Sequence, residues 1–335
     1  MAQDISVINA AQRRFDQDRD NRRAQLDMRV AEVYHRVPRV QEIDRRLRST
    51  VGRIMIAAFD SDGDPGPALR EMEKENLALQ RERAELLVGA GYPYDYLDEK
   101  PVCSICEDRG YLSDGTMCRC LKAYCTQEQN RRLSKLLDLG GQSFDTFSLD
   151  WYDSQVWPEF HTSPLRNMEI VLEICANYAH KFGPNSSNLL FTGKPGLGKT
   201  FLSACIAREV SERGFSVVYD TAAHVFQQFE SGKFGRDNPY EEDPDREVDR
   251  YLNCDLLIMD DLGTEMTTSF VQATFYRIVN DRLMSRKPMV LSTNLTVDEI
   301  GRRYGEAVRS RLEGEYQVLR FFGEDIRLKK RDQRF

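Results

Sequence analysis

The chain has 335 residues, enough for roughly two or three compact units, one of them large enough to bury a substantial core. Hydrophobic residues make up 41% of it and charged residues 30%, a balance that excludes a disordered or membrane-embedded chain. The formal net charge of -7 argues against non-specific coating of nucleic acid, although it leaves a local basic groove open. The start MAQDISVINA lacks a basic segment followed by an apolar one, and no run reaches the ~18 apolar residues that span a bilayer. We therefore expect a cytoplasmic protein without membrane contact.

Residues 1–95 are expected to form a helical region. Apolar residues recur there at helical spacing, and Pro38 is predicted to break or kink the run. The segment DSDGDPGP at 60–67 predicts a turn, and a second helix with regularly spaced leucines should end at the breaker GAGYP, 89–93. A helical hairpin is the structural interpretation and an arm that binds a partner protein is the functional one. Both can hold, because two helices alone bury too little surface to be very stable.

Five of the eight cysteines lie close together, and residues 96–126 are expected to form a zinc-binding module. The expected ligands are Cys103, Cys106, Cys118 and Cys120. Cys-x2-Cys is a zinc-knuckle spacing, and Cys-x-Cys brings two more thiolates onto one face of an extended segment. Because Cys-x-Cys is less usual, Cys125 is an alternative fourth ligand, and reduced cysteines without metal are the other interpretation. Four thiolates leave no open position, so the metal would be structural.

Residues 127–164 are expected to be a connector whose aromatic side chains pack against the domain that follows. Residues 165–335 alternate helical and strand-like patterns. The strand-like runs are Leu189–Phe191, Val217–Tyr219, Leu256–Met259 and Met289–Leu291. This alternation predicts an α/β fold in which helices cover both faces of a parallel sheet.

The sequence GKPGLGKT directly follows the first strand-like run and precedes a helical pattern, which is the context that a phosphate-binding P-loop requires. The expected nucleotide-binding residues are Gly193, Lys194, Pro195, Gly196, Leu197, Gly198, Lys199, Thr200 and Phe201. Lys199 is expected to reach the β- and γ-phosphates of ATP, and the Thr200 hydroxyl to hold Mg²⁺. A glycine-rich turn without a ligand is the competing interpretation.

The run LLIMDD places Asp260 and Asp261 at the C-terminal end of a strand, where ligands bind in open α/β sheets. Asp260 fits the Walker B carboxylate that orients magnesium, and Asp261 is the candidate general base. Glu265 is an alternative base because it reaches farther, and Asp261 can instead cap the strand end. Asn294 ends the next strand, where its amide can position the attacking water or simply form a turn.

The order of these motifs, followed by VRSRL and a late DIR, resembles the AAA+ ATPases of the DnaC/DnaI-type helicase loader group, with the IstB transposition helpers as close relatives. The resemblance covers residues 140–335, and GYP with CSICEDRGY looks more loosely like the zinc-containing adaptor of some loaders. Only a few residues follow the late DIR. The resemblance therefore implies an AAA+ module without the helical lid.

The resemblance also implies roles for three arginines. Arg311, with Arg309 as the second choice, takes the place of an arginine finger that completes the site of a neighbouring subunit. Arg327 would act as a sensor on the nucleotide of its own chain. The alternative is that Arg309 and Arg311 solvate a helix or pair with Glu306 and Glu313.

In the loader group a helix inserted after the second strand lines a channel and contacts single-stranded DNA. Lys233 and Phe234 offer the charge and the stacking surface that such contact needs, and Thr268 and Phe270 could face the same channel. The alternative is that Phe229 and Phe270 belong to the core and Lys233 to a solvated turn.

Together these features indicate an ATP-dependent loader of the replicative helicase onto single-stranded DNA, which grips the helicase hexamer through residues 1–126 and self-associates through its ATPase domain. The alternative is an IstB-like ATP-binding regulator of DNA transposition, which would bind duplex DNA and a transposase. A third interpretation is an adaptor that binds nucleotide and helicase without significant turnover.

Overall fold

The computed structural model describes residues 5–60, 66–133, 141–234 and 244–332, except for the side chains of 51–69, 232–246 and 332. The chain divides into two compact units. One comprises Met1–Gln12 and Leu121–Phe335, and the other is Arg13–Cys120. The four segments expected from the sequence divide the chain more finely, and their boundaries stay predictions.

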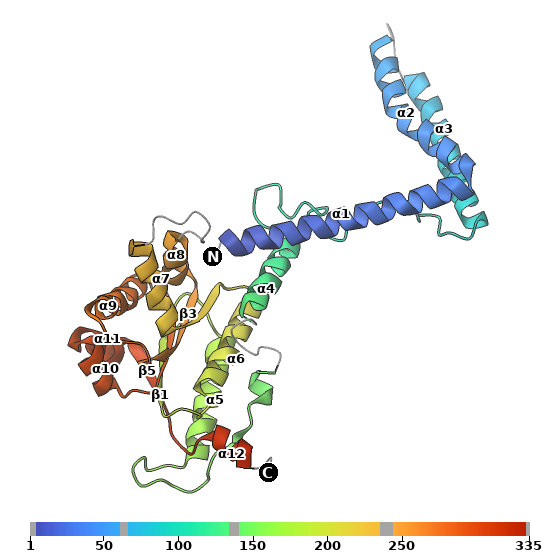
Figure 1. The fold of residues 1–335 in the computed structure, drawn as a ribbon. Helices are drawn as coiled ribbons and strands as arrows, with labels where there is room; N and C mark the ends of the chain where they lie inside the picture. The colour runs from blue at the N-terminus through green and yellow to red at the C-terminus, as the bar shows by residue number, and fades with distance from the viewer. Residues whose placement is uncertain (1–4, 61–65, 134–140, 235–243, 333–335) are drawn as a thin grey trace. The chain divides into compact units, whose positions relative to one another are not determined.

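The unit Arg13–Cys120 is helical at its start. The helix α1 (Ile5–Arg36) ends just before α2 (Pro38–Asp60), which confirms the predicted break at Pro38. Proline suits the first position of a helix because its missing N–H needs no partner there. The helix α3 (Gly66–Gly89) ends at the predicted breaker and pairs with α2 as a hairpin (Figure 1). A small core joins the three helices to the following turn through Val33, Val40, Leu87 and Leu97.

The larger unit contains, within the described residues, a five-stranded parallel sheet with the strand order β2-β3-β4-β1-β5. The strands are β1 (Asn188–Gly193), β2 (Val217–Thr221), β3 (Leu256–Leu262), β4 (Met289–Thr293) and β5 (Tyr316–Phe321). The first four confirm the predicted strand-like runs. β5 was not predicted from the sequence, because this edge strand mixes exposed and buried residues and is not a continuous apolar run.

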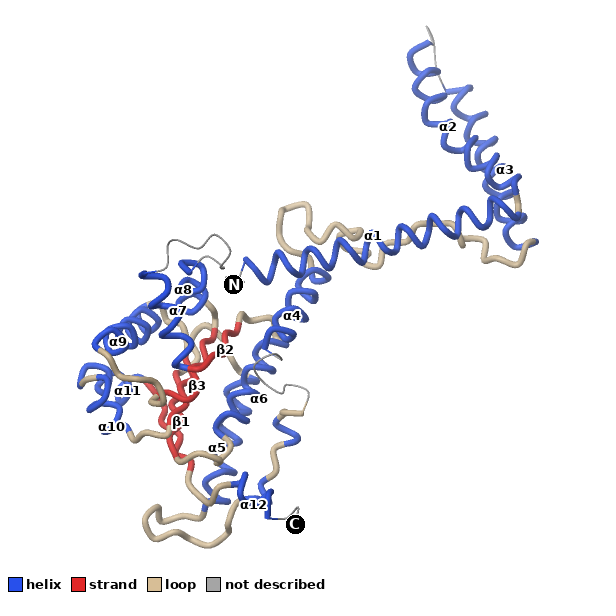
Figure 2. The backbone as a smooth tube through the Cα atoms, in the orientation of Figure 1, coloured by secondary structure: helices blue, strands red, loops and turns tan. Residues whose placement is uncertain are grey.

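Helices cover both faces of the sheet, which confirms the predicted α/β fold (Figures 1 and 2). One face packs against α5 (Pro164–His180) and α6 (Lys199–Glu212). The other packs against α7 (Ala222–Phe234), α8 (Pro244–Asn253), α9 (Ser269–Met284), α10 (Val297–Tyr304) and α11 (Glu306–Glu315). After β5 the described residues form α12 (Ile326–Asp332). Among the described residues, no helix combines the length and the apolar character needed to cross a bilayer.

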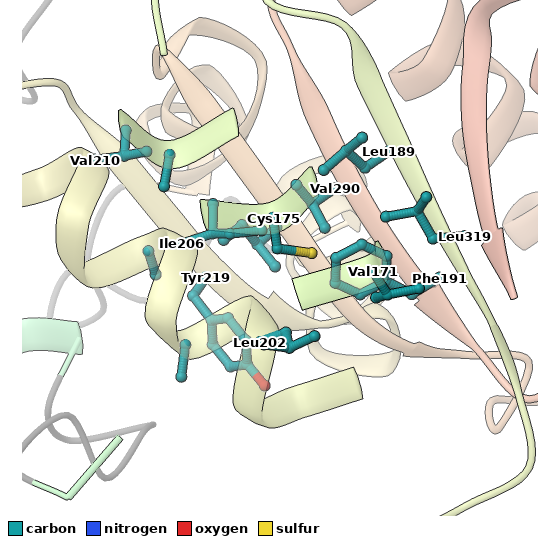
Figure 3. Close-up of a cluster of buried hydrophobic side chains, with 14 of the residues drawn as sticks. Val171, Cys175, Leu189, Phe191, Leu202, Ile206, Val210, Tyr219, Val290 and Leu319 are labelled. Atoms are coloured by element: carbon teal, nitrogen blue, oxygen red, sulfur yellow. The ribbon is translucent and has the colours of Figure 1, made fainter. Parts of the chain in front are cut away.

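The predicted connector packs against the core beneath α5 and α6, as expected from its aromatic residues. Figure 3 shows that core, where side chains of the sheet such as Phe191 meet Ile206 and Leu202 of α6. Tyr152 belongs to this core. Phe144 of the short helix η1 (Phe144–Thr146), Phe147 just after it, and Leu149 and Trp151 of the short helix η2 (Leu149–Trp151) pack against the core. The connector begins in α4 (Arg119–Leu133). The side-chain amide of Gln129 in this helix donates a hydrogen bond to the carbonyl oxygen of Phe215 at 2.7 Å.

Candidate functional site

The P-loop joins β1 to α6 and is shaped by glycines in the left-handed region. Gly196 and Gly198 have φ of 77° and 93°. A Cβ on Gly196 would lie 1.9 Å from Oδ1 of Asp325, so the loop can approach that side chain only with glycine here. Gly198 directly precedes α6, whose first N–H groups and positive dipole end therefore face the loop. This is the geometry that binds phosphate at a helix N-terminus.

Lys199 is buried at the centre of the loop, with 6% of its surface exposed. Its Nζ donates to the carbonyl oxygens of Gly193 (2.5 Å) and Lys194 (2.8 Å) and to Oδ1 of Asn294 (2.8 Å). Burial lowers the pKa of Lys199 to about 8, although the charges of Asp260 and Asp261 act in the opposite direction. The structure thus brings the predicted P-loop lysine together with the predicted residue at the end of β4.

Asp260 lies at the end of β3, is only 2% exposed and accepts three hydrogen bonds. Its Oδ2 accepts from Thr200 Oγ1 at 2.8 Å and from the Tyr219 hydroxyl at 2.5 Å, and its Oδ1 accepts from the backbone N–H of Asp261 at 3.0 Å. Burial and the Asp260 carboxylate raise the pKa of Tyr219, which therefore stays a protonated donor. The two predicted magnesium ligands, Thr200 and Asp260, lie in direct contact.

Asp261 occupies a bulge in β3. Met259 pairs with Leu291 of β4 and Leu262 pairs with Thr293, so β3 has one residue more than β4 between these pairs. Asp261 takes up the irregularity with φ of 54°, a conformation that aspartate tolerates better than most residues. Partial desolvation, and next the charge of Asp260, raise the pKa of the Asp261 carboxyl.

Glu265, the alternative base, is held by other groups. Its carboxylate accepts from the backbone N–H of Gly263 at 3.1 Å and from the hydroxyl of Tyr304 at the end of α10. Tyr304 was not singled out from the sequence, because nothing local indicates that α10 folds back on this turn. The contacts of Glu265 therefore favour Asp261 as the candidate base.

Arg327 lies in the first turn of α12, which docks on the P-loop. The backbone N–H of Ile326 donates to the carbonyl oxygen of Gly196 at 3.0 Å. The charge of Arg327 lowers the pKa of both Lys199 and Asp261, although it is a minor contribution in each case. Its position is compatible with the predicted sensor, whose role stays a prediction.

The two candidate finger arginines of α11 differ in their surroundings. Arg311 lies over the ring of Tyr276, 4.6 Å from its centroid, and donates to the hydroxyl of Tyr276 (2.8 Å) and to Oδ1 of Asn280 (3.0 Å). Arg309 forms ion pairs with three carboxylates, those of Asp298, Glu306 and Glu313. The alternative interpretation therefore describes Arg309 well, whereas Arg311 is held on the surface by neutral groups.

The candidate DNA-binding residues have partly structural surroundings. Lys233 and Phe234 end α7, and their side chains lie outside the described part of the chain. Thr268 caps α9 by accepting from the backbone N–H of Val271 at 3.2 Å, and Phe270 packs against the core. The helix cap explains Thr268 and the core contact explains Phe270 without DNA. The DNA-binding role of each of the four residues stays a prediction.

The four cysteines of the expected zinc module are clustered. The Sγ atoms of Cys103, Cys106, Cys118 and Cys120 all lie within 4.8 Å of one another, so together they could hold a metal ion. An antiparallel bridge between Tyr111 and Met117 brings the two pairs together. Cys125 lies buried in α4 and is not part of this group, and burial raises the pKa of its thiol.

Asp108 organises the first cysteine turn and was missed in the sequence. Its Oδ1 accepts from the backbone N–H of Cys103 at 2.8 Å, and its Oδ2 accepts from that of Val102 at 3.1 Å. Arg22 of α1 forms an ion pair with the same carboxylate at 3.1 Å. Asp108 therefore ties the cysteine turn to α1, and no sequence pattern marks a contact across so many residues.

The sheet domain resembles a known protein family. A family model described as IstB-like ATP binding protein matches residues 171–334. The matched range contains the P-loop, the β3 aspartates and α12, the elements that meet in the geometry above. Residues 171–334 are therefore similar to an IstB-like ATP-binding domain. The match does not include the helical region or the cysteine cluster.

Curated relatives match part of the chain. The replicative helicase loader DnaC of Escherichia coli K12 is 30% identical over 135 residues, which are 40% of this chain and 54% of DnaC. DnaC of Buchnera aphidicola subsp. Baizongia pistaciae shows the same identity and coverage. The chain therefore spans about half the length of these relatives.

Two solved structures are similar to part of the chain. A crystal structure of the DnaC helicase loader has a TM-score of 0.42 and 21% identity and covers 53% of this chain and 98% of that one. A crystal structure of DnaI has a TM-score of 0.44 and 16% identity and covers 55% of this chain and 93% of that one.

Proposed function

We propose that the chain is an AAA+-type ATPase that loads a replicative DNA helicase onto single-stranded DNA in the cytoplasm. The observation that carries the nucleotide part is the convergence of Lys199, Thr200, Asp260 and Asn294 at one edge of the sheet. The 30% identity to DnaC supports the loading part. The test is direct: the chain should bind ATP with Mg²⁺, and binding should be lost in Lys199→Ala.

The residues at this edge fit the steps of ATP hydrolysis. The Thr200 hydroxyl and the Asp260 carboxylate are oxygen ligands of the kind that Mg²⁺ prefers. These two groups would hold a bound Mg²⁺, which would supply positive charge against the phosphates. Lys199 exchanges its loop carbonyl partners for phosphate oxygens, and Asn294, freed from Lys199, orients the attacking water. Asp261 accepts the proton of that water.

The cysteine cluster and the helices before it form the proposed binding region for the helicase hexamer. Four thiolates within 4.8 Å of one another suit structural Zn²⁺, which would fold the loop between Cys103 and Cys120. Asp108 then links the metal module to α1. The helicase is thus held by a part of the chain outside the ATP-binding domain.

Assembly and DNA binding complete the proposal. Arg311 donates hydrogen bonds to Tyr276 and Asn280, which hold its side chain in place. We propose that its guanidinium contacts the γ-phosphate of the ATP bound to a neighbouring subunit. Lys233 and Phe234, with Thr268 and Phe270, are the proposed contacts to single-stranded DNA.

The second candidate is an ATP-binding regulator of DNA transposition, the role implied by the resemblance of the sequence motifs to the IstB helpers. The two functions differ in the DNA they need. A loader should bind single-stranded DNA better than duplex DNA when ATP is present, and a transposition regulator should prefer duplex DNA. Fluorescence anisotropy with a labelled oligonucleotide, alone and annealed to its complement, separates them.

A further inference from the structure

Tyr219 connects β2 to the proposed magnesium site on β3. Its Cα is in register with that of Ile258, and Asp260 follows two residues later on the same side of β3. The Tyr219 ring packs in the core beside α6 (Figure 3). Its hydroxyl thereby reaches the Asp260 carboxylate along the strand, at 2.5 Å.

The hydroxyl of Tyr219 holds Asp260 in a way that Thr200 cannot. Both side chains donate to the same oxygen, Oδ2. Thr200, however, is the residue proposed to contact Mg²⁺ itself, so its hydroxyl must adjust when the ion binds. Tyr219 is fixed in the apolar core and can keep the carboxylate in place before and after binding. Groups that orient metal ligands in this way strongly affect metal affinity.

We propose that Tyr219 is a positioning residue that presents the Asp260 carboxylate to Mg²⁺ in the ATP site. The inference rests on the proposed Mg²⁺–ATP function. It predicts a specific defect, because loss of the hydroxyl should weaken the use of Mg²⁺ and leave the contacts of the P-loop with nucleotide intact.

The chain contains a matched control on the opposite face of the sheet. The hydroxyl of Tyr251 in α8 donates to Oδ2 of Asp220 at 2.6 Å, and this tyrosine is also buried. Asp220 is the neighbour of Tyr219 on β2, but its other side-chain partner is His224 of α7, outside the nucleotide site. Tyr251→Phe therefore removes an equivalent buried hydroxyl from an equivalent carboxylate, and Tyr219→Phe keeps the ring that fills the core.

The experiment measures the affinity of the full-length chain for a non-hydrolysable ATP analogue as Mg²⁺ is titrated, with EDTA as the starting point. In Tyr219→Phe we expect unchanged affinity in EDTA and a Mg²⁺ midpoint raised about tenfold. Tyr251→Phe should keep the wild-type midpoint. ATP hydrolysis should show the same pattern, with the rate of Tyr219→Phe approaching that of wild type at saturating Mg²⁺.

Three results would overturn the inference: a wild-type midpoint in Tyr219→Phe, equal shifts in both tyrosine variants, or loss of nucleotide binding by Tyr219→Phe in EDTA. A wild-type chain whose nucleotide affinity does not respond to Mg²⁺ would instead refute the proposed ATP site itself. The two failures are therefore distinguishable in one titration series.

Discussion

Asp261 is the residue on which the proposed chemistry depends most. The bulge in β3 turns it out of the strand, next to the buried Asp260. Glu265, by contrast, accepts hydrogen bonds from Gly263 and Tyr304. A general base must be free to accept a proton from water. We therefore expect replacement of Asp261 to slow ATP hydrolysis and replacement of Glu265 to have little effect on it.

Asp261→Asn should keep ATP binding and slow hydrolysis by about 100-fold to 10,000-fold, the usual contribution of a general base. Glu265→Gln is the matched control, because it also replaces a carboxylate by an amide, and it should retain most activity. Phosphate release under single-turnover conditions measures both variants. A loss only in Glu265→Gln would assign the base to Glu265, and equal losses in the two variants would contradict the assignment to Asp261 alone.

The raised pKa of Asp261 predicts how the rate of ATP hydrolysis depends on pH. The pKa of Asp261 is raised above the ordinary aspartate value of about 3.9. A base works in its deprotonated form, so hydrolysis should fall as the pH drops through this raised pKa, at higher pH than an ordinary aspartate would require. The acid limb should be absent from the residual rate of Asp261→Asn. An identical limb in that variant would show that another group causes it.

At the scale of elements, the sequence predicted what is encoded locally. β1 to β4 were predicted because a strand buried on both faces is a continuous apolar run, and the P-loop because its glycines and lysine stand at a fixed spacing. β5 was missed because an edge strand keeps exposed residues such as Gln317. The contacts of Tyr219 and Asp108 depend on how distant segments pack, and no local pattern marks them.

The cysteine module yields an element-scale prediction. Purified chain should contain one Zn²⁺, and Cys103→Ser should lose it while the sheet domain still binds ATP, because the metal folds a separate element. Cys125→Ser is the control and should keep the metal, since Cys125 is not in the cluster. The zinc content per chain is measured by elemental analysis of protein purified without chelator. Metal-free wild-type protein, or loss of metal from Cys125→Ser, would contradict the assignment.

At the scale of the whole molecule, the proposed ATPase activity requires two chains to associate. Arg311→Ala should bind ATP but lose hydrolysis and ATP-dependent self-association, because its guanidinium acts on the neighbour's nucleotide. Arg309→Ala should keep hydrolysis, because its three carboxylate partners lie on its own chain. Mixing Arg311→Ala with Lys199→Ala should restore some activity, since one chain supplies the P-loop and the other the finger. Full hydrolysis by dilute, monomeric Arg311→Ala would refute the role in trans.

The central claim, that ATP binding in this domain drives helicase loading, is tested most directly by mixing the full-length chain with a hexameric replicative helicase and circular single-stranded DNA. Helicase that stays with the DNA is measured by gel filtration. We predict that it is retained with the wild-type chain and ATP, and lost with Lys199→Ala or without ATP. A chain that binds ATP and duplex DNA but never retains helicase on single strands would contradict the claim and favour a role in transposition.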